Sequence, residues 1–452
     1  MPNPTQDTGA LDLESSTMRR VARRLMPLII VCYLVAYIDR SNVSIAALTM
    51  NEDIGLTAAA YGLGAGLFFV TYIIFEIPSN LALHRFGARR WIARIMITWG
   101  IVAACMALVV GEKSFYTVRL LLGAAEAGFT PGIIFYLSQW FPKRHRARAM
   151  GRFYVGAALA TVIGAPLSGL LLNLDGLLGL AGWKWLFVVS GIPAVVLGFI
   201  VLRFFTDYPA QAHWLPERNR EWLVSTMTRE RDEAEAVRKF SIRGALFHPG
   251  TLLLALFFFL YSFNSIGLTL WMPQVIKGTF GTPSNLVTTL LTAIPYAFAV
   301  IFMLIVGRQV DRGGRRHIYM AVPMALAGVL LVGSVAAGQS LLGFLLLAVS
   351  TGFAWSAVPA LWSTATAFTS GVAAAAAVAL INSTANIAGV AVPPLIGRVR
   401  EATGSFAVPL LLIAGAMLAA AAVALVSNRY THEGSLAASV TDNESAPNES
   451  VR

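Results

Sequence analysis

The feature that most constrains this chain is a series of apolar segments, each as long as a bilayer is thick. An α-helix crosses the hydrocarbon core with roughly 20 residues, because it rises about 1.5 Å per residue. Helices also satisfy their own backbone hydrogen bonds, as lipid requires. The sequence therefore predicts an all-α membrane protein with twelve transmembrane helices in two six-helix halves. The expected spans are 26–48, 59–83, 91–110, 115–138, 149–173, 183–205, 251–276, 284–306, 317–337, 341–362, 371–396 and 406–426.

Composition excludes a soluble protein of this size. Of the 452 residues, 57% are hydrophobic and 13% are charged, too few charges to cover a water-facing surface. The net charge of +11 could suit nucleic acid, but the basic residues lie in short loops between apolar segments. That placement is typical of membrane topology, so no nucleic-acid partner is expected. Cys32 and Cys105 lie within apolar segments, so no disulfide framework is expected.

Basic loops alternate with loops that are poor in basic residues. The basic loops precede span 1 and follow spans 2, 4 and 8, and they contain Arg19, Arg20, Arg23, Arg24, Arg85, Arg89, Arg90, Lys143, Arg144, Arg146, Arg148, Arg308, Arg312, Arg315 and Arg316. Such loops stay in the cytoplasm, which predicts a multi-pass protein of the cell (inner or plasma) membrane with both termini cytoplasmic. The expected organisation is a disordered leader at 1–25, helical halves at 26–205 and 249–426, a linker at 206–248 and a disordered tail at 427–452.

An internal repeat supports the two halves. Span 2 is followed by Arg-Phe-Gly-Ala-Arg-Arg at 85–90, and span 8 by Asp-Arg-Gly-Gly-Arg-Arg at 311–316. Either loop alone could be a simple topology anchor, but equivalent positions in both halves favour duplication. Two related halves are a transporter architecture, in which the substrate site is expected near the midplane between them.

Several motifs carry a resemblance to a known family. Residues 307–316 read G-x-x-x-D-R-x-G-R-R, which resembles the signature loop of the major facilitator superfamily. In the first-half copy Asn80 replaces the usual Gly and His84 the usual Asp, which resembles the anion:cation symporter branch. This branch includes bacterial tartrate and phthalate permeases and the galactonate–proton symporter. Further matching stretches are 37–42, 75–80, 119–128, 140–142 and 381–386.

Arg40 is the candidate receptor for a substrate carboxylate. It shares a helix face with Tyr33 and Tyr37, at spacing i, i+4 and i+7. A guanidinium fork beside phenol hydroxyls suits both oxygens of a carboxylate, and the resemblance implies the same role. Tyr37 is expected to line the site, whereas Tyr33 could be packing. The alternative for Arg40 is an ion pair that only locks helices together.

Three more ionisable residues are candidates for proton coupling. Glu126 lies between Gly123 and Gly128, whose small size allows close helix packing and burial. By resemblance Glu126 is the central proton carrier, coupled to Arg40. The resemblance also implies proton binding at Asp39 and charge coupling at Arg119. A tether to another helix stays open for Asp39, as does a structural pair with backbone or an acid for Arg119.

Further candidates come from the remaining polar residues within or beside the spans. The expected substrate-lining residues are Tyr72, Asn382, Asn386 and Ser363, and the expected gating loop contains Gly307, Asp311, Arg312 and Arg315. The sequence has no phosphate-binding loop, no Cys/His cluster with metal spacing and no nucleophile–base arrangement. No cofactor, metal or enzymatic activity is therefore expected.

The sequence and the resemblance together predict a proton-coupled symporter. It would import a small organic anion, such as tartrate or phthalate, by alternating access and as a monomer in the bilayer. The alternatives left open are an anion sensor without net flux and an exporter or exchanger of sugar acids or other organic anions. The identity of the anion, the proton stoichiometry and a role for sodium are not fixed by these motifs.

Overall fold

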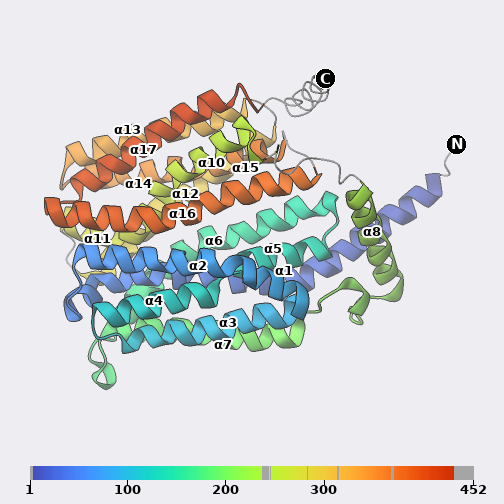
Figure 1. Ribbon diagram of the computed structural model, residues 1–452, viewed down its shortest axis with the longest axis horizontal. Coiled ribbons are helices and arrows are strands. Elements are labelled where there is room, and N and C mark those ends of the chain that lie inside the picture. Colours follow the sequence, from blue (N-terminus) through green and yellow to red (C-terminus); the bar gives the residue numbers. More distant parts are fainter. Residues whose placement is uncertain are drawn as a thin grey trace, which may run out of the picture. The chain divides into compact units, whose positions relative to one another are not determined.

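The computed structural model describes residues 4–236, 244, 246–281, 284–312, 315–367 and 371–431. Within these ranges the regular secondary structure is entirely helical (Figure 1). The first helices are α1 (Pro4–Asp53), α2 (Ala58–Phe86), α3 (Ala88–Cys105), α4 (Glu112–Glu126), α5 (Phe129–Trp140), α6 (Lys143–Leu172), α7 (Gly182–Phe204) and α8 (Glu217–Ala236). The later ones are α10 (Pro249–Ser262), α11 (Thr269–Phe280), α12 (Asn285–Asp311), α13 (Arg316–Ala337), α14 (Leu341–Ser356), α15 (Val358–Ala367), α16 (Gly371–Thr403) and α17 (Ala407–Ser427).

The predicted membrane helices are present. Among the described residues, 11 helical segments are long and apolar enough to cross a bilayer. The expected fifth span falls in α6, a helix of 30 residues whose apolar part, Val162–Leu172, counts as a shorter helix. The all-α membrane fold predicted from the sequence is therefore confirmed.

The chain forms two compact units. The first contains Met1–Glu235 and Thr282–Ala293, and the second contains Ala236–Gly281 and Ile294–Arg452. The start of α12 thus belongs to the first unit, although the sequence places it in the second half. Close packing explains this assignment, since a Cβ atom on Gly169 of α6 would overlap the hydroxyl of Thr289.

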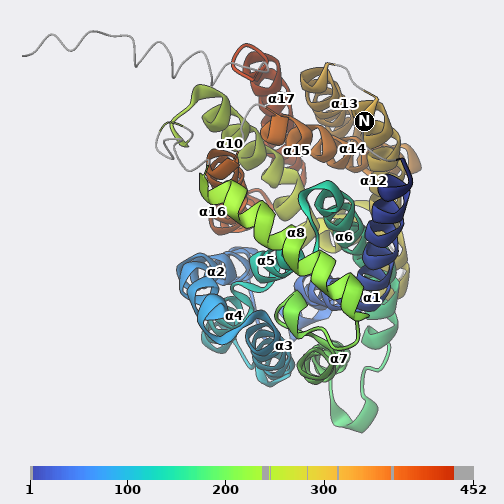
Figure 2. The same ribbon diagram turned by 90° about the vertical axis from the view of Figure 1, so that its right-hand side faces the viewer.

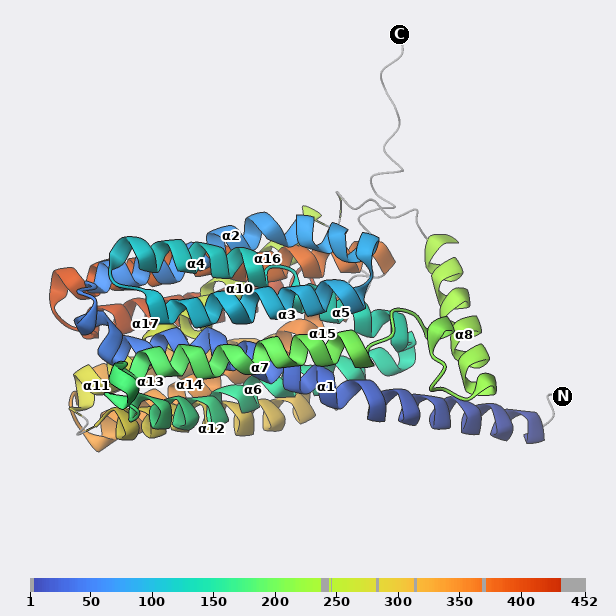
Figure 3. The same cartoon turned by 90° about the horizontal axis from the view of Figure 1, so that it is seen from below.

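Glycines let helices approach closely within each unit. In the first unit, α3 and α7 lie side by side (Figures 1 and 3), and Gly100 and Gly191 each face the other's backbone carbonyl. Helices α2 and α4 pack in the same manner through Gly123 of α4. In the second unit, Gly328 of α13 lies against α17. Small residues at helix contacts are the usual basis of helix packing in membranes.

The leader differs from the expected disordered segment. Helix α1 begins at Pro4, and Met18, Val21 and Leu25 are buried on one of its faces. They belong to the same apolar cluster as Leu215 and Leu223 of the linker region. The prediction of a disordered leader is therefore wrong for residues 12–25, because this stripe of apolar side chains has a packing partner that the sequence did not reveal.

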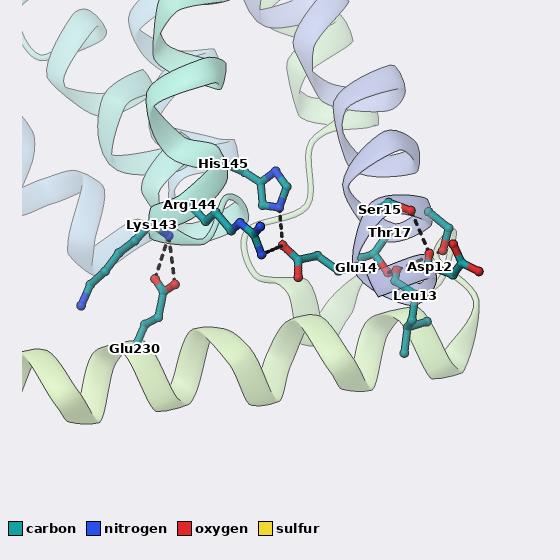
Figure 4. Close-up of polar contacts among 10 residues, drawn as sticks. Asp12, Leu13, Glu14, Ser15, Thr17, Lys143, Arg144, His145 and Glu230 are labelled. Atoms are coloured by element: carbon teal, nitrogen blue, oxygen red, sulfur yellow. Dashed lines mark hydrogen bonds and ion pairs between the residues drawn. The ribbon is translucent and has the colours of Figure 1, made fainter. Parts of the chain in front are cut away.

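Polar contacts join the leader, the α5–α6 turn and α8 at one end of the first unit (Figures 2 and 4). The Nε2 atom of His145 lies 2.6 Å from a carboxylate oxygen of Glu14, and Arg144 lies 3.9 Å from it. The backbone N–H of Lys143 donates to both carboxylate oxygens of Glu230 in α8, at 2.9 and 3.0 Å. The linker thus contains a helix, α8, that packs against the first unit. Of the predicted tail, residues from 432 onward lie outside the described residues.

Candidate substrate and proton site

An ion pair buried in the first unit is the centre of the candidate site. The Nε–H of Arg40 in α1 donates to Oε1 of Glu126 in α4, at 2.5 Å. The Glu126 side chain is 1% exposed, whereas that of Arg40 is 30% exposed. Oε2 of Glu126 is buried and has no hydrogen-bond partner among the described residues. The pair thus has one accessible cation and one incompletely satisfied carboxylate.

A break in the fourth span positions Glu126. The sequence predicted one continuous helix at 115–138, but α4 ends at Glu126 and α5 begins at Phe129. Gly128 adopts a positive φ of 87°, where a side chain would also overlap Ser79 of α2. One turn earlier, Gly123 packs directly on the backbone carbonyl of Phe68. The two glycines therefore hold the carboxylate at a helix end pressed against α2.

Aromatic rings surround the Arg40 guanidinium. Its Cζ lies 5.2 Å from the ring centroid of Tyr72 and 5.8 Å from that of Phe68. Such cation–π contacts stabilise a cation without neutralising it. The ring centroids of Tyr33 and Tyr37 lie 5.5 Å apart, and those of Tyr33 and Phe153 lie 3.9 Å apart. Phe68 was not predicted from the sequence, although it lies four residues, about one helical turn, before Tyr72.

Arg119 is bound to backbone. Its guanidinium donates to the carbonyl oxygens of Gly64 and Ala65 in α2, at 3.2 and 3.3 Å, and its Cζ lies 4.8 Å from the Phe68 ring. Arg40 and Arg119 therefore contact the same aromatic ring. The carbonyl contacts correspond to the structural alternative that the sequence left open, and a role in charge coupling stays a prediction.

Asp39 lies in a different environment from its neighbour Arg40. Its carboxylate accepts hydrogen bonds from Trp99 Nε1 in α3, at 2.7 Å, and from Ser190 Oγ in α7, at 3.4 Å. Adjacent residues of a helix are turned about 100° apart, which directs Asp39 into the α1–α3–α7 contact. These bonds form a tether between three helices, and proton binding at Asp39 stays a prediction.

The candidates in the second unit lie on α15 and α16 and at the end of α12 with the loop that follows it. Asn382 is exposed in α16, whereas Asn386 and Ser363 are half-buried. Gly307 lies near the end of α12, with room for a Cβ atom beside Pro359, and Arg312 and Arg315 are exposed. The side chain of Asp311 lies outside the described residues.

Asn264 was missed by the sequence reading. It lies in a π-helical segment, Phe263–Leu268, that interrupts the span formed by α10 and α11. Its side chain is buried, and neither the nitrogen nor the oxygen of the amide has a hydrogen-bond partner among the described residues. A π-helical turn with a polar side chain is often a functional site. The sequence signal for this site was an asparagine at the centre of an apolar span.

Asp207 was missed as well. Its carboxylate accepts the backbone N–H of Arg89 at the start of α3, at 2.8 Å, while Arg89 Nε donates to the Leu202 carbonyl. The first-half loop, which has His84 where an acid is usual, thus receives a carboxylate from the end of α7. The His84 ring instead packs against Phe135, with centroids 4.3 Å apart.

A helical membrane fold whose interior holds an ion pair with one accessible partner is typical of solute transporters. The chain belongs to the Major Facilitator Superfamily, whose sequence profile matches residues 29–393. The members of this superfamily are transporters and not enzymes, in agreement with the absence of catalytic motifs.

The chain is also similar to individual proteins over most of its length. The chain is 46% identical to a protein of Agrobacterium vitis named "Putative tartrate transporter", over 93% of this chain and 97% of that protein. It is 40% identical to a "Quinolone resistance transporter" of Acinetobacter baumannii, over 90% of this chain and 94% of that protein. The crystal structure of a D-xylose–proton symporter shares the fold, with a TM-score of 0.72 at 14% identity, over 91% of this chain and 98% of that one.

Proposed function

We propose that this transporter is a proton-coupled symporter that imports a small organic anion, a carboxylate such as tartrate or phthalate, by alternating access. The observation that carries the proposal is the ion pair of Arg40 and Glu126, in which the cation is accessible and the carboxylate is buried. The tartrate assignment also draws on the similarity to the Agrobacterium vitis protein, which extends over nearly the whole chain.

Arg40 is the proposed anion receptor. The hydrogen bond to Glu126 uses Nε–H, so the terminal N–H groups of the fork are the proposed donors to a substrate carboxylate. The rings of Phe68 and Tyr72 cover part of the guanidinium, and this lowers the local dielectric constant and strengthens its attraction for an anion. Tyr37, Asn382, Asn386 and Ser363 are proposed to bind the remaining polar groups of the substrate.

Coupling follows from the charge balance around Arg40. One cation balances the Glu126 carboxylate, so a bound substrate carboxylate adds a negative charge that is not balanced. A proton on Glu126 leaves Arg40 to balance one substrate carboxylate, and each ligand therefore favours binding of the other, whereas the second carboxylate of a dianion such as tartrate needs a further proton or cation. This linkage is reciprocal, because substrate and proton must change each other's affinity by the same factor. Asp39 and Arg119 are proposed as further members of the coupling network.

The orientation and the gate are also part of the proposal. The basic loops are placed in the cytoplasm, with both termini on that side of the inner membrane. The loop residues Gly307, Asp311, Arg312 and Arg315 are proposed to control opening on the cytoplasmic side, as the resemblance of residues 307–316 implies.

The test is uptake of radiolabelled tartrate into proteoliposomes under an imposed pH gradient. Glu126→Gln should abolish accumulation driven by the gradient while retaining tartrate exchange, since the neutral amide cannot release a proton. Arg40→Ala should abolish both activities. Glu112→Gln is the matched control, because it makes the same chemical change at an exposed position of the same helix. Full gradient-driven accumulation by Glu126→Gln would contradict the proposal.

Export is the second candidate, and the similarity to the quinolone resistance transporter favours it. An exporter would drive a quinolone out of cells in exchange for protons, with no uptake of carboxylates. Measuring norfloxacin retention and tartrate uptake in the same cells separates the two functions.

A further inference from the structure

A groove on the surface of the first unit lies apart from the Arg40–Glu126 pair. Helices α2, α3 and α4, which neighbour one another in Figures 2 and 3, line this open groove, which has a volume of about 450 Å³. Its walls include Phe75, Pro78, Trp91, Arg94, Val102 and Leu121. Phe75 and Leu121 are exposed apolar side chains, the kind of surface that a membrane protein turns toward lipid. Among the described residues that line the groove, Arg94 alone is charged.

Arg94 is a fixed cation without a counter-ion. Its Cζ lies 4.1 Å from the ring centroid of Trp91, and the Trp91 indole N–H donates to Ser79 Oγ at 2.9 Å. The Nε atom of Arg94 is buried without a hydrogen-bond partner, and no carboxylate of the described residues pairs with the guanidinium. A half-buried guanidinium without a counter-ion is costly, so an anion from outside the chain would be favoured at this position.

The groove changes from polar to apolar along α3. Arg94, Thr98 and Val102 follow one another in steps of one helical turn, and all three line it. Arg94 lies six residues after the start of α3, a depth of about 9 Å, from which an arginine side chain can reach the headgroup region. The start of α3 also carries the exposed Arg90, one helical turn before Arg94. This end of the groove is therefore cationic, whereas the other end is lined by hydrocarbon.

We propose that this groove is a binding site for an anionic phospholipid of the phosphatidylglycerol class. The headgroup phosphate binds the Arg94 guanidinium, and an acyl chain lies along Val102, Ala124 and Leu121. The cationic end selects the anionic headgroup, because the ammonium group of a zwitterionic lipid would be repelled by the neighbouring arginines. Basic pockets between transmembrane helices are suitable sites for anionic headgroups. The transport proposal is not required for this inference.

The test is native mass spectrometry of the detergent-purified, full-length protein titrated with dioleoyl-phosphatidylglycerol. One phosphatidylglycerol should bind more tightly than the others, and Arg94→Gln should weaken that site roughly fivefold or more. Ala124→Phe should weaken it as well by filling the acyl part, with the arginine intact. Arg203→Gln is the matched control, because it removes a charge from an exposed position at the end of α7, outside the groove.

Three outcomes would overturn the proposal. The first is an unchanged tight site in both Arg94→Gln and Ala124→Phe. The second is equal binding of dioleoyl-phosphatidylcholine, which would show that the groove holds acyl chains without selecting charge. The third is equally tight binding of soluble glycerol 3-phosphate, which would identify an anion site that does not recognise lipid. A thermal-shift measurement on each variant verifies that the protein remains folded.

Discussion

The two units differ in the kind of polar group that they bury. The first unit buries charges, namely Asp39, Arg119 and Glu126, and half-buries Arg40. Among the described residues of the second unit, the buried polar side chains are neutral: Thr251, Ser262, Asn264, Ser334, Ser350, Thr351, Ser356, Thr364 and Ser427. The two units are thus both helical, but the polar chemistry of their interiors differs.

Buried charges and buried neutral polar groups suit different tasks in a transporter. A charge at mid-bilayer costs roughly 2.5–3.5 kcal/mol on insertion scales, and a chain retains it where a charge must be handled. A buried hydroxyl or amide costs less and recognises polar groups of a substrate without carrying a proton. Proton handling is therefore expected to depend on the first unit, and selection among anions on both.

The largest expected effect is on the stability of the first unit. Arg40→Met leaves the Glu126 carboxylate buried without its partner, which should destabilise the protein by about 3–5 kcal/mol. The double variant Arg40→Met/Glu126→Gln removes both charges and should recover most of that loss. Thermal unfolding in detergent measures both effects. A double variant no more stable than Arg40→Met would show that the pair does not hold α1 and α4 together.

The second-largest expected effect on stability distinguishes two glycines, one in each unit. Gly123→Ala in the first unit places a methyl group against the Phe68 carbonyl, and α2 and α4 must separate, which costs about 1–3 kcal/mol. Gly307→Ala in the second unit meets Pro359 at 3.8 Å, an ordinary contact, and should be neutral or slightly stabilising. Unfolding midpoints of the two variants test this contrast, and equal losses would refute it.

These contrasts indicate what the sequence could predict. Lipid imposes helices about 20 residues long, so the membrane fold and most span positions followed from hydropathy alone. Helix-face geometry together with the family resemblance brought Arg40, Tyr72 and Glu126 into one candidate site, and the structure places them in contact. The partners of Asp39 were not predictable, because Trp99 and Ser190 are 60 and 151 residues away in the chain. The break before Gly128 and the π-helical turn at Asn264 were missed because hydropathy cannot distinguish an interrupted span from a continuous one.

A smaller effect is expected at Asn264 in the second unit. Because its amide has no partner among the described residues, Asn264→Ala should leave thermal stability unchanged or slightly raised. If the amide binds substrate, the KM for tartrate should rise roughly fivefold to tenfold, with the proton dependence of uptake preserved. Ser262→Ala is the control, since Ser262 donates to the Phe258 carbonyl of its own helix. An unchanged KM would remove Asn264 from the site.

The smallest effect concerns helix caps, one in each unit. Thr57 caps α2 by accepting the Ala60 N–H, whereas His248 caps α10 by accepting the Gly250 N–H at Nδ1. Burial lowers the pKa of His248 from its usual 6.5, so the folded state favours the neutral ring that can accept this bond. As the pH falls below about 6.5, the unfolded chain takes up the proton first, and the stabilisation from this cap is progressively lost.

His248→Asn should keep the cap and abolish this pH dependence. The expected size of the pH effect is about 0.5–1 kcal/mol in the free energy of unfolding, measured between pH 7.5 and 5. Thr57→Ala should lose a similar amount at every pH, and identical pH profiles for wild type and His248→Asn would contradict the titratable cap.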